Sequence, residues 1–134
     1  MIKFSEAVAL AEENGACYDD MEIIRSMSSC EEFWAHPKAP KWAYWYAKHI
    51  LEGRWTEAEK VIITNTMWAY WYARDIIRGR WPEAEPVFRK DPEVAYWYSR
   101  NILRCRWPEA ERVIMTDPMS WYWYSKNVIR GDAT

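Results

Sequence analysis

The sequence predicts an all-α fold, an α-solenoid of short helix–loop–helix repeats with an N-terminal capping helix and a C-terminal half repeat. The first observation is a fixed period: Ala-Tyr-Trp-Tyr at residues 43–46 returns 26 residues later at 69–72 and again at 95–98, and Trp-Tyr-Trp-Tyr follows at 121–124. Such a period is typical of stacked supersecondary units that bury their apolar faces against their neighbours. The second observation is that signals for helix starts and stops recur with the same period.

The period divides a chain of 134 residues, an ordinary length for a single domain, into six segments. Residues 1–16 are predicted to form the capping helix, with Gly15 as its stop. Residues 17–42 match the later copies only with a one-residue shift, so they are a degenerate first repeat. Full repeats follow at 43–68, 69–94 and 95–120, and a half repeat occupies 121–134.

Each repeat is expected to open with a longer helix, called helix A. In one copy Asp91 is a good N-cap and Pro92 suits the first helical position, so helix A should run from there to about Arg104. Glycine is predicted to end helix A in the left-handed conformation, with Cys105 as the exception. The glycines are Gly53, Gly79 and Gly131.

A shorter helix, called helix B, completes each repeat. It is predicted to begin at Thr56, Pro82 or Pro108, with a buried stripe such as Ala84, Val87 and Phe88. Glutamates crowd its first turn, where they favour the positive end of the helix dipole. We therefore interpret these paired carboxylates as helix-start residues and expect no catalytic role for them.

The tryptophan in the middle of each Tyr-Trp-Tyr motif is the feature that core packing does not obviously require. On a helical wheel of 100° per residue, Trp71 falls opposite the apolar arc, among polar residues. The equivalent tryptophans in the other copies are Trp45, Trp97 and Trp123. Each of the four tryptophans is followed three residues later by a cation: Lys48, Arg74, Arg100 and Lys126 in chain order. Further cations lie near the helix end, at Arg78, Arg104 and Arg130. These residues are the candidate partner-binding face.

Two interpretations of this face remain open at this point. In the structural one, Trp71 packs between stacked A helices with Arg78 or Arg104 across its ring, a contact worth roughly 0.5–1 kcal/mol when exposed. In the functional one, the tryptophans form a ladder that binds a protein, since aromatic and arginine side chains dominate interface hot spots. The alternative partner is a single-stranded nucleic acid whose bases stack on the ladder beside Asn101 and Asn127. The glutamates of every helix B speak against a continuous electrostatic groove.

Other function classes find little support in the sequence. His36 and His49 are the only histidines, and no catalytic constellation or metal-ligand spacing is evident, so we expect no enzyme, metal site or cofactor. Residues 1–42 hold 4 Lys/Arg against 8 Asp/Glu and residues 43–134 hold 14 against 12, an asymmetry too small to imply nucleic acid or an anionic membrane. Three cysteines without ligand spacing and no apolar signal segment predict a reducing, intracellular setting and no membrane partner.

The last helix A has no following helix B in this sequence. Four of its apolar residues are therefore expected to be exposed and to allow a homodimer through the C-terminal half repeat: Trp121, Tyr122, Tyr124 and Val128. This is the predicted oligomer contact.

The string Gly-Arg-Trp-Pro-Glu-Ala-Glu-Pro-Val at residues 79–87, followed by Asp91-Pro92 and by Ala-Tyr-Trp-Tyr at 95–98, resembles short tandem repeats in uncharacterised proteins of tailed bacteriophages and related bacterial sequences. The resemblance covers residues 43–131 well and residues 17–42 poorly. It implies a small phage-type protein in the cytoplasm of a bacterial host. Such proteins often bind a host factor, for example to inhibit a defence or toxin system. We therefore expect a non-enzymatic inhibitor or adaptor.

Overall fold

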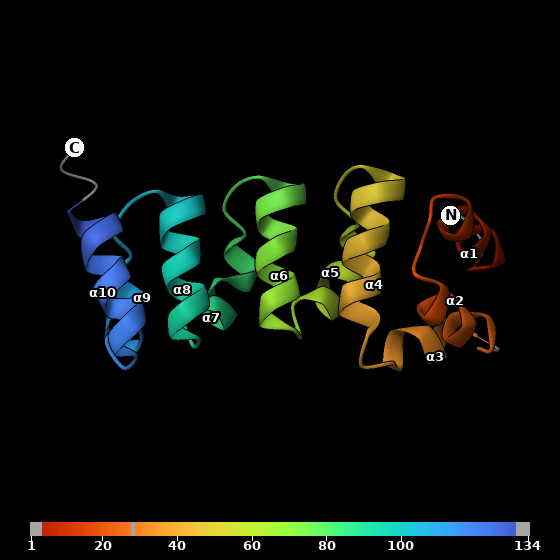
Figure 1. The fold of residues 1–134 in the computed structure, drawn as a ribbon, viewed down its shortest axis with the longest axis horizontal. Helices are drawn as coiled ribbons and strands as arrows, with labels where there is room; N and C mark the ends of the chain where they lie inside the picture. The colour runs from red at the N-terminus through yellow and green to blue at the C-terminus, as the bar shows by residue number, and fades with distance from the viewer. Residues whose placement is uncertain (1–3, 28, 131–134) are drawn as a thin grey trace. The chain divides into compact units, whose positions relative to one another are not determined.

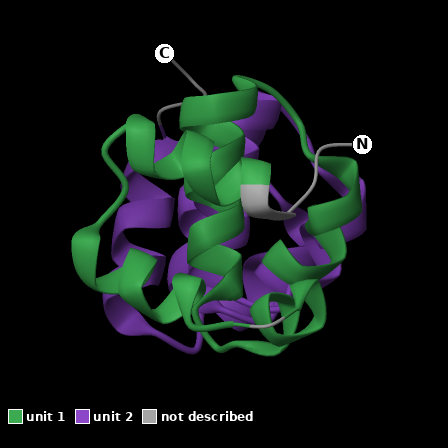
Figure 2. Cartoon of the chain, turned by 90° about the vertical axis from the view of Figure 1, so that its right-hand side faces the viewer, with its two compact units in different colours: residues 1–62 green, residues 63–134 purple. Residues whose placement is uncertain are grey.

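The computed structural model describes residues 4–27 and 29–130, and every regular element within these ranges is helical. The predicted all-α class and its repeated short helices are confirmed. Where the sequence suggests one domain, the chain divides into two compact units, unit 1 (residues 1–62) and unit 2 (residues 63–134), coloured in Figure 2. A repeat array divides easily in this way, because each repeat packs only against its neighbours.

Unit 1 holds the predicted capping helix and the degenerate first repeat. After the first helix, Gly15 has a φ of 85°, the left-handed stop that the sequence predicts. The core of this unit gathers Met21, Ile24, Phe33 and Trp42. Its elements are α1 (Phe4–Glu13), α2 (Tyr18–Arg25), α3 (Cys30–Ala35), α4 (Ala39–Tyr46), the π-helical turn η1 (Ala47–Leu51) and α5 (Thr56–Ile62).

Unit 2 is a stack of A helices backed by B helices. Helices α6, α8 and α10 lie side by side, with α7 and α9 behind them (Figure 1), and α8 contacts all four of the others. The A helices and their terminal π turns are α6 (Thr66–Tyr72) with η2 (Ala73–Ile77), α8 (Pro92–Tyr98) with η4 (Ser99–Leu103), and α10 (Pro118–Tyr124) with η5 (Ser125–Ile129). The B helices are η3 (Pro82–Ala84) with α7 (Glu85–Phe88), and α9 (Pro108–Ile114).

The helix starts follow the predicted capping chemistry. The Asp91 carboxylate accepts hydrogen bonds from the backbone N–H groups of Glu93 at 3.0 Å and Val94 at 3.1 Å, so the predicted N-cap is confirmed. The B helices begin at Thr56, Pro82 and Pro108, also as predicted. The middle one opens with a 3₁₀ turn because Pro86 has no N–H to donate to the Pro82 carbonyl.

The helix ends differ from the prediction. The left-handed residues are Glu52, Arg78 and Arg104, with φ of 53°, 60° and 56°, whereas Gly53 and Gly79 do not have positive φ. Each A helix ends in a π turn; in η2 the Arg78 N–H bonds to the Ala73 carbonyl at 2.8 Å, and the left-handed residue lies one position before the glycine. After the last A helix Arg130 has a φ of −77°, and Gly131 lies outside the described residues. Cys105 replaces a glycine without strain because positive φ is required at Arg104 instead.

A partly buried hydrogen-bond network joins α8 and α10 of unit 2 to the loop and helix B that precede each of them. The Tyr98 hydroxyl accepts a bond from the Trp81 N–H at 2.9 Å and donates one to the Glu85 carboxylate at 2.7 Å. Arg80 donates two bonds to the same carboxylate, at 3.0 and 2.9 Å. The next repeat repeats this network with Arg106, Trp107, Glu111 and Tyr124. These glutamates therefore bind a buried tyrosine in addition to opening a helix.

The network predicts a pH dependence of stability with two limbs. Burial raises the pKa of Glu85, but hydrogen bonds from Arg80 and Tyr98 outweigh it, so this pKa lies below 4.5. Stability from Glu85 is present above pH 4.5 and is lost as the pH falls through the folded pKa. Burial and the bond to Glu111 raise the pKa of Tyr124 from 10.0 to about 12, so stability from this tyrosine is present below pH 10 and is lost as the pH rises towards 12.

Urea unfolding as a function of pH checks this expectation. The free energy of unfolding should fall on both sides of the plateau, and Tyr124→Phe should flatten the alkaline limb. An alkaline limb of unchanged slope in that variant would show that Tyr124 is not held neutral by the fold.

Candidate functional site

The predicted partner-binding residues divide between the two units. Trp45 and Lys48 lie in unit 1, where Trp45 packs against the core of that unit and its ring lies 4.9 Å from His49. Lys48 donates to the Tyr44 hydroxyl at 3.3 Å. Trp45 therefore packs at the edge of the hydrophobic core of unit 1. The candidate site described below consists of residues of unit 2.

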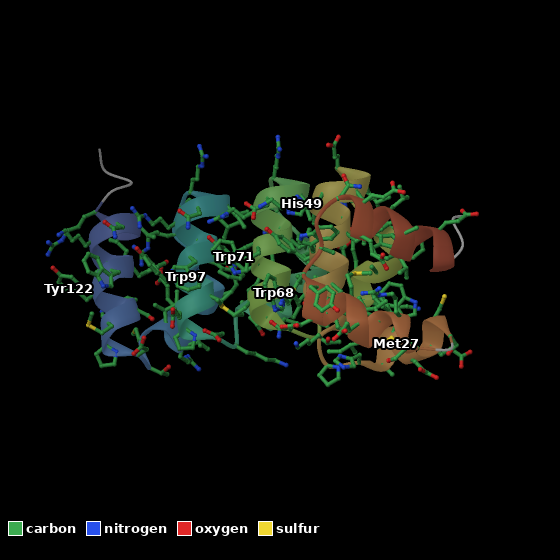
Figure 3. All side chains as sticks on the ribbon, turned by 45° about the vertical axis from the view of Figure 1, so that its right-hand side comes forward. Met27, His49, Trp68, Trp71, Trp97 and Tyr122 are labelled. Carbon is green, nitrogen blue, oxygen red and sulfur yellow. The ribbon has the colours of Figure 1, made fainter. Side chains whose placement is uncertain are left out.

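The Trp–cation face of unit 2 consists of one tryptophan and one cation from each A helix. Each tryptophan is the sixth residue of its helix, and the cation follows three residues later on the π turn, so the two side chains share one side of the helix. The three cations are exposed, and of the tryptophans Trp123 is the most open, at 39% exposed. Figure 3 labels Trp71 and Trp97 on successive A helices. The face comprises Trp71, Trp97, Trp123, Arg74, Arg100 and Lys126.

The contact between Trp71 and Arg74 is the closest on this face. The Arg74 guanidinium lies 4.1 Å from the centre of the Trp71 ring, and its Nε donates to the Asp75 carboxylate at 2.9 Å. The bond to Asp75 raises the pKa of Arg74 above its ordinary value. The cation over this ring is thus Arg74, where the structural interpretation named Arg78 or Arg104; Arg78 is a left-handed cap residue whose side chain bonds to the Asp75 carbonyl at 3.4 Å.

The other two tryptophan–cation pairs have different geometries. The Lys126 ammonium lies 5.6 Å from the centre of the Trp123 ring and 6.0 Å from that of Tyr122. Arg100 instead bonds to the Tyr96 hydroxyl at 3.3 Å. Each cation is thus next to an aromatic ring and still open to solvent, a combination that suits recognition of an anionic group beside an apolar one.

The same face also contributes to packing between repeats. The Trp97 ring lies 5.7 Å from that of Tyr70, and Asn101 donates to the Tyr70 hydroxyl at 2.8 Å. One repeat later, Asn127 donates to the Tyr96 hydroxyl at 2.9 Å. The structural interpretation of the ladder is therefore partly correct, because Trp97 packs against the preceding repeat, whereas the functional interpretation stays a prediction. Sequence reasoning missed these two tyrosines, although the Tyr–Asn separation of 31 residues occurs twice.

An arginine-lined cleft lies where the ends of two A helices of unit 2 meet. It has a volume of about 360 Å³ and is lined by Arg74, Arg78, Arg104, Asn101, Gly79 and Ile102. The three guanidinium groups come from η2 and from the left-handed caps that follow η2 and η4. The three residues lie at the carboxyl ends of A helices, where cations are favoured, and they concentrate positive charge at one edge of the face.

The predicted oligomer contact needs a correction. Tyr124 is fully buried and Val128 is 1% exposed within unit 2, so neither is available to a second chain. The hydroxyl of Tyr124 is held in the network with Glu111, which draws the side chain inward. Tyr122 is 53% exposed and Trp121 is half-buried, and these two alone retain the predicted role.

Comparisons with known proteins leave the site to be judged from its own geometry. No protein-family model, curated protein or solved structure matches this chain. Among the described residues, no His, Cys, Asp and Glu side chains group in a way that suits a metal ion. None of the helices in the described ranges combines the length and the apolar character needed to cross a bilayer.

Proposed function

We propose that this chain is a non-enzymatic protein-binding module and that the Trp–cation face of unit 2 holds its partner. The observation that carries the proposal is the tryptophan–cation pair repeated on successive A helices, with its closest contact between Trp71 and Arg74 at 4.1 Å. Arginine and tryptophan are the side chains most often responsible for binding energy at interfaces. A repeated face of this kind suits an extended segment of a partner protein.

The charges on the face specify the kind of segment. The cations Arg74, Arg100 and Lys126 are exposed, and the neighbouring carboxylate, Asp75, is paired with Arg74. The arginine-lined cleft adds positive charge at the same edge. The proposed partner therefore presents acidic side chains between apolar or aromatic ones.

The biological context of the proposal comes from the repeat motif. Its resemblance to phage tandem repeats supports a host protein as the partner, bound in the bacterial cytoplasm by a phage-type inhibitor or adaptor. Single-stranded nucleic acid remains the alternative outcome of the test. It has less support because Asn101 and Asn127, the side chains expected beside a stacked base, are bonded to tyrosines of the preceding repeat.

Homodimerisation is a separate prediction that now rests on Trp121 and Tyr122. Their rings are at least partly accessible on α10, which suits contact with a second copy. A strict monomer in light scattering at high protein concentration would contradict it.

Reversal of charge on the face is expected to weaken partner binding strongly. Arg74→Glu combined with Arg100→Glu should weaken binding of the protein partner by about thirtyfold or more, the effect of losing a hot-spot contact of about 2 kcal/mol. Trp123→Ala should weaken it by a comparable factor at all salt concentrations. Binding is measured by surface plasmon resonance on the captured partner.

The matched control changes the net charge equally at another site. Lys90→Glu combined with Arg112→Glu alters two cations that lie outside the face, both exposed and belonging to the segments around α7 and α9. This control should bind the partner within about twofold of the unaltered protein, since distant surface charges contribute little. Equal losses in both double variants would mean that net charge, and not the face, governs binding.

A further inference from the structure

Tyr46 in unit 1 occupies the repeat position of Tyr98 but lacks its hydrogen bonds. Tyr98 binds Glu85, thirteen residues earlier, whereas the residue thirteen positions before Tyr46 is Phe33. Tyr46 is only 7% exposed, and its hydroxyl has no hydrogen-bond partner among the described residues. Burial also raises its pKa, which keeps the hydroxyl protonated as a donor. A buried hydroxyl without a partner is unfavourable unless something else supplies one.

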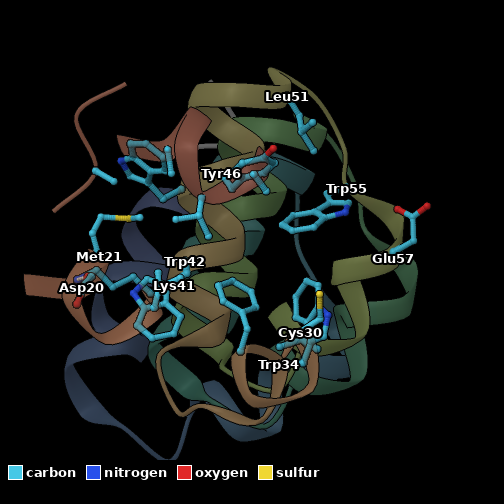
Figure 4. A pocket seen from close by; sticks show the side chains of 18 of the residues that line it. Asp20, Met21, Cys30, Trp34, Lys41, Trp42, Tyr46, Leu51, Trp55 and Glu57 are labelled. Carbon is cyan, nitrogen blue, oxygen red and sulfur yellow. Dashed lines mark hydrogen bonds and ion pairs between the residues drawn. The ribbon is translucent and has the colours of Figure 1, made fainter. Parts of the chain in front are cut away.

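A large apolar cavity opens beside this tyrosine, entirely within unit 1. Its volume is about 860 Å³, within the range of small-molecule sites, which spans about 300 to 1,000 Å³. Figure 4 shows Tyr46 among the side chains that line it, together with Met21, Trp34, Trp42 and Trp55. Aromatic walls with few polar groups suit an apolar molecule.

Three of the charged side chains that line the cavity are held in ion pairs. Asp20 accepts a bond from Lys41 at 3.1 Å, and Arg54 is paired with Glu59 at 2.7 Å. The charged residues that line the wall are Asp20, Lys41, Arg54, Glu57 and Lys60. The Tyr46 hydroxyl and the Trp42 indole N–H are buried and have no hydrogen-bond partner among the described residues, and both can donate to an acceptor on a ligand.

We infer that this cavity binds an apolar molecule carrying a single carboxylate, whose oxygen accepts the Tyr46 hydrogen bond in the way that Glu85 accepts that of Tyr98. The inference is independent of the proposed protein-binding function, because the cavity lies in unit 1 and the Trp–cation face lies in unit 2. The later repeats show the bond itself, with tyrosine-to-carboxylate distances of 2.7 and 2.6 Å. In unit 1 the residue thirteen positions before the tyrosine is Phe33, so a ligand takes the place of the protein's own carboxylate.

Titration with two matched probes tests the inference on the full chain. The first probe is 4-phenylbutyrate, and the second is butylbenzene, which has the same apolar body and no acceptor. Binding is followed by NMR of the indole N–H signals of the eleven tryptophans. Both probes should shift the signals of tryptophans that line the cavity, namely Trp34, Trp42, Trp45 and Trp55, and leave those of unit 2 in place.

Tyr46→Phe separates the hydrogen bond from the apolar fit. It should weaken binding of 4-phenylbutyrate about tenfold or more, because bonds to charged groups are the stronger class, and leave butylbenzene binding within about twofold. The matched control Tyr44→Phe removes a hydroxyl of the same helix that does not line the cavity, and it should change neither affinity. Failure of 4-phenylbutyrate to bind, or binding that Tyr46→Phe leaves unchanged, would overturn the inference.

Discussion

Ala95→Trp is expected to abolish the cooperative folding of unit 2. Ala95 has no exposed surface and lies on α8, the helix that contacts α6, α7, α9 and α10. The core around Ala95 leaves no space for an indole, so overpacking of this size should lower the free energy of unfolding by at least about 4 kcal/mol. A unit of this length is stabilised by roughly 4 to 11 kcal/mol in total, so the loss removes much or all of the stability. Urea unfolding followed by circular dichroism measures it.

The control for this substitution is Glu93→Trp. Glu93 lies on the same helix and is exposed, so a tryptophan there adds the same bulk without entering the core. It should cost no more than about 1 kcal/mol, mainly from the loss of a favourable charge in the first turn. If Ala95→Trp unfolded no more readily than Glu93→Trp, close packing of the A helices would not be what holds unit 2 together.

Tyr98→Phe and Tyr46→Phe are expected to have opposite consequences although they are the same change at the same repeat position. Tyr98→Phe leaves the buried N–H of Trp81 without its acceptor and removes a donor from Glu85, so it should lower the free energy of unfolding by about 2 kcal/mol. Tyr46→Phe removes a hydroxyl that has no partner among the described residues, so it should be neutral or stabilise by up to about 1 kcal/mol.

Thermal and urea unfolding of the two variants check the contrast. Tyr124→Phe should behave like Tyr98→Phe, since its hydroxyl bonds Glu111 and the Trp107 N–H in the same way. A loss in Tyr46→Phe equal to that in Tyr98→Phe would mean that the Tyr46 hydroxyl is satisfied in solution.

Most of the fold could be predicted because the repeat supplies the same local signals several times. N-caps such as Asp91 and first-position prolines such as Pro92 act through their own neighbouring N–H groups, so sequence alone indicates where helices begin. The helix ends were less accessible to sequence. A wheel of constant pitch does not anticipate the π turns, and these place the left-handed residue at Arg78 instead of Gly79.

The candidate site was predicted in its composition but not in its contacts. Trp71 and Arg74 were placed together by their spacing of three, a local relation. Trp97, in contrast, packs against Tyr70, and Tyr124 turns inward to Glu111, because residues of neighbouring repeats meet there. The Tyr46 hydroxyl has no partner among the described residues, and sequence alone did not show this because the preceding repeat is degenerate and Phe33 stands thirteen positions before the tyrosine.

Capture of partners from a bacterial lysate tests the central claim most directly. The tagged chain, the Arg74→Glu/Arg100→Glu variant and the Lys90→Glu/Arg112→Glu control are compared with and without nuclease, and bound material is quantified by mass spectrometry. The proposal predicts a protein that resists nuclease, is lost with the first variant and is retained by the control. Recovery of nucleic acid alone, abolished by nuclease, or of a protein held equally by both variants, would contradict it.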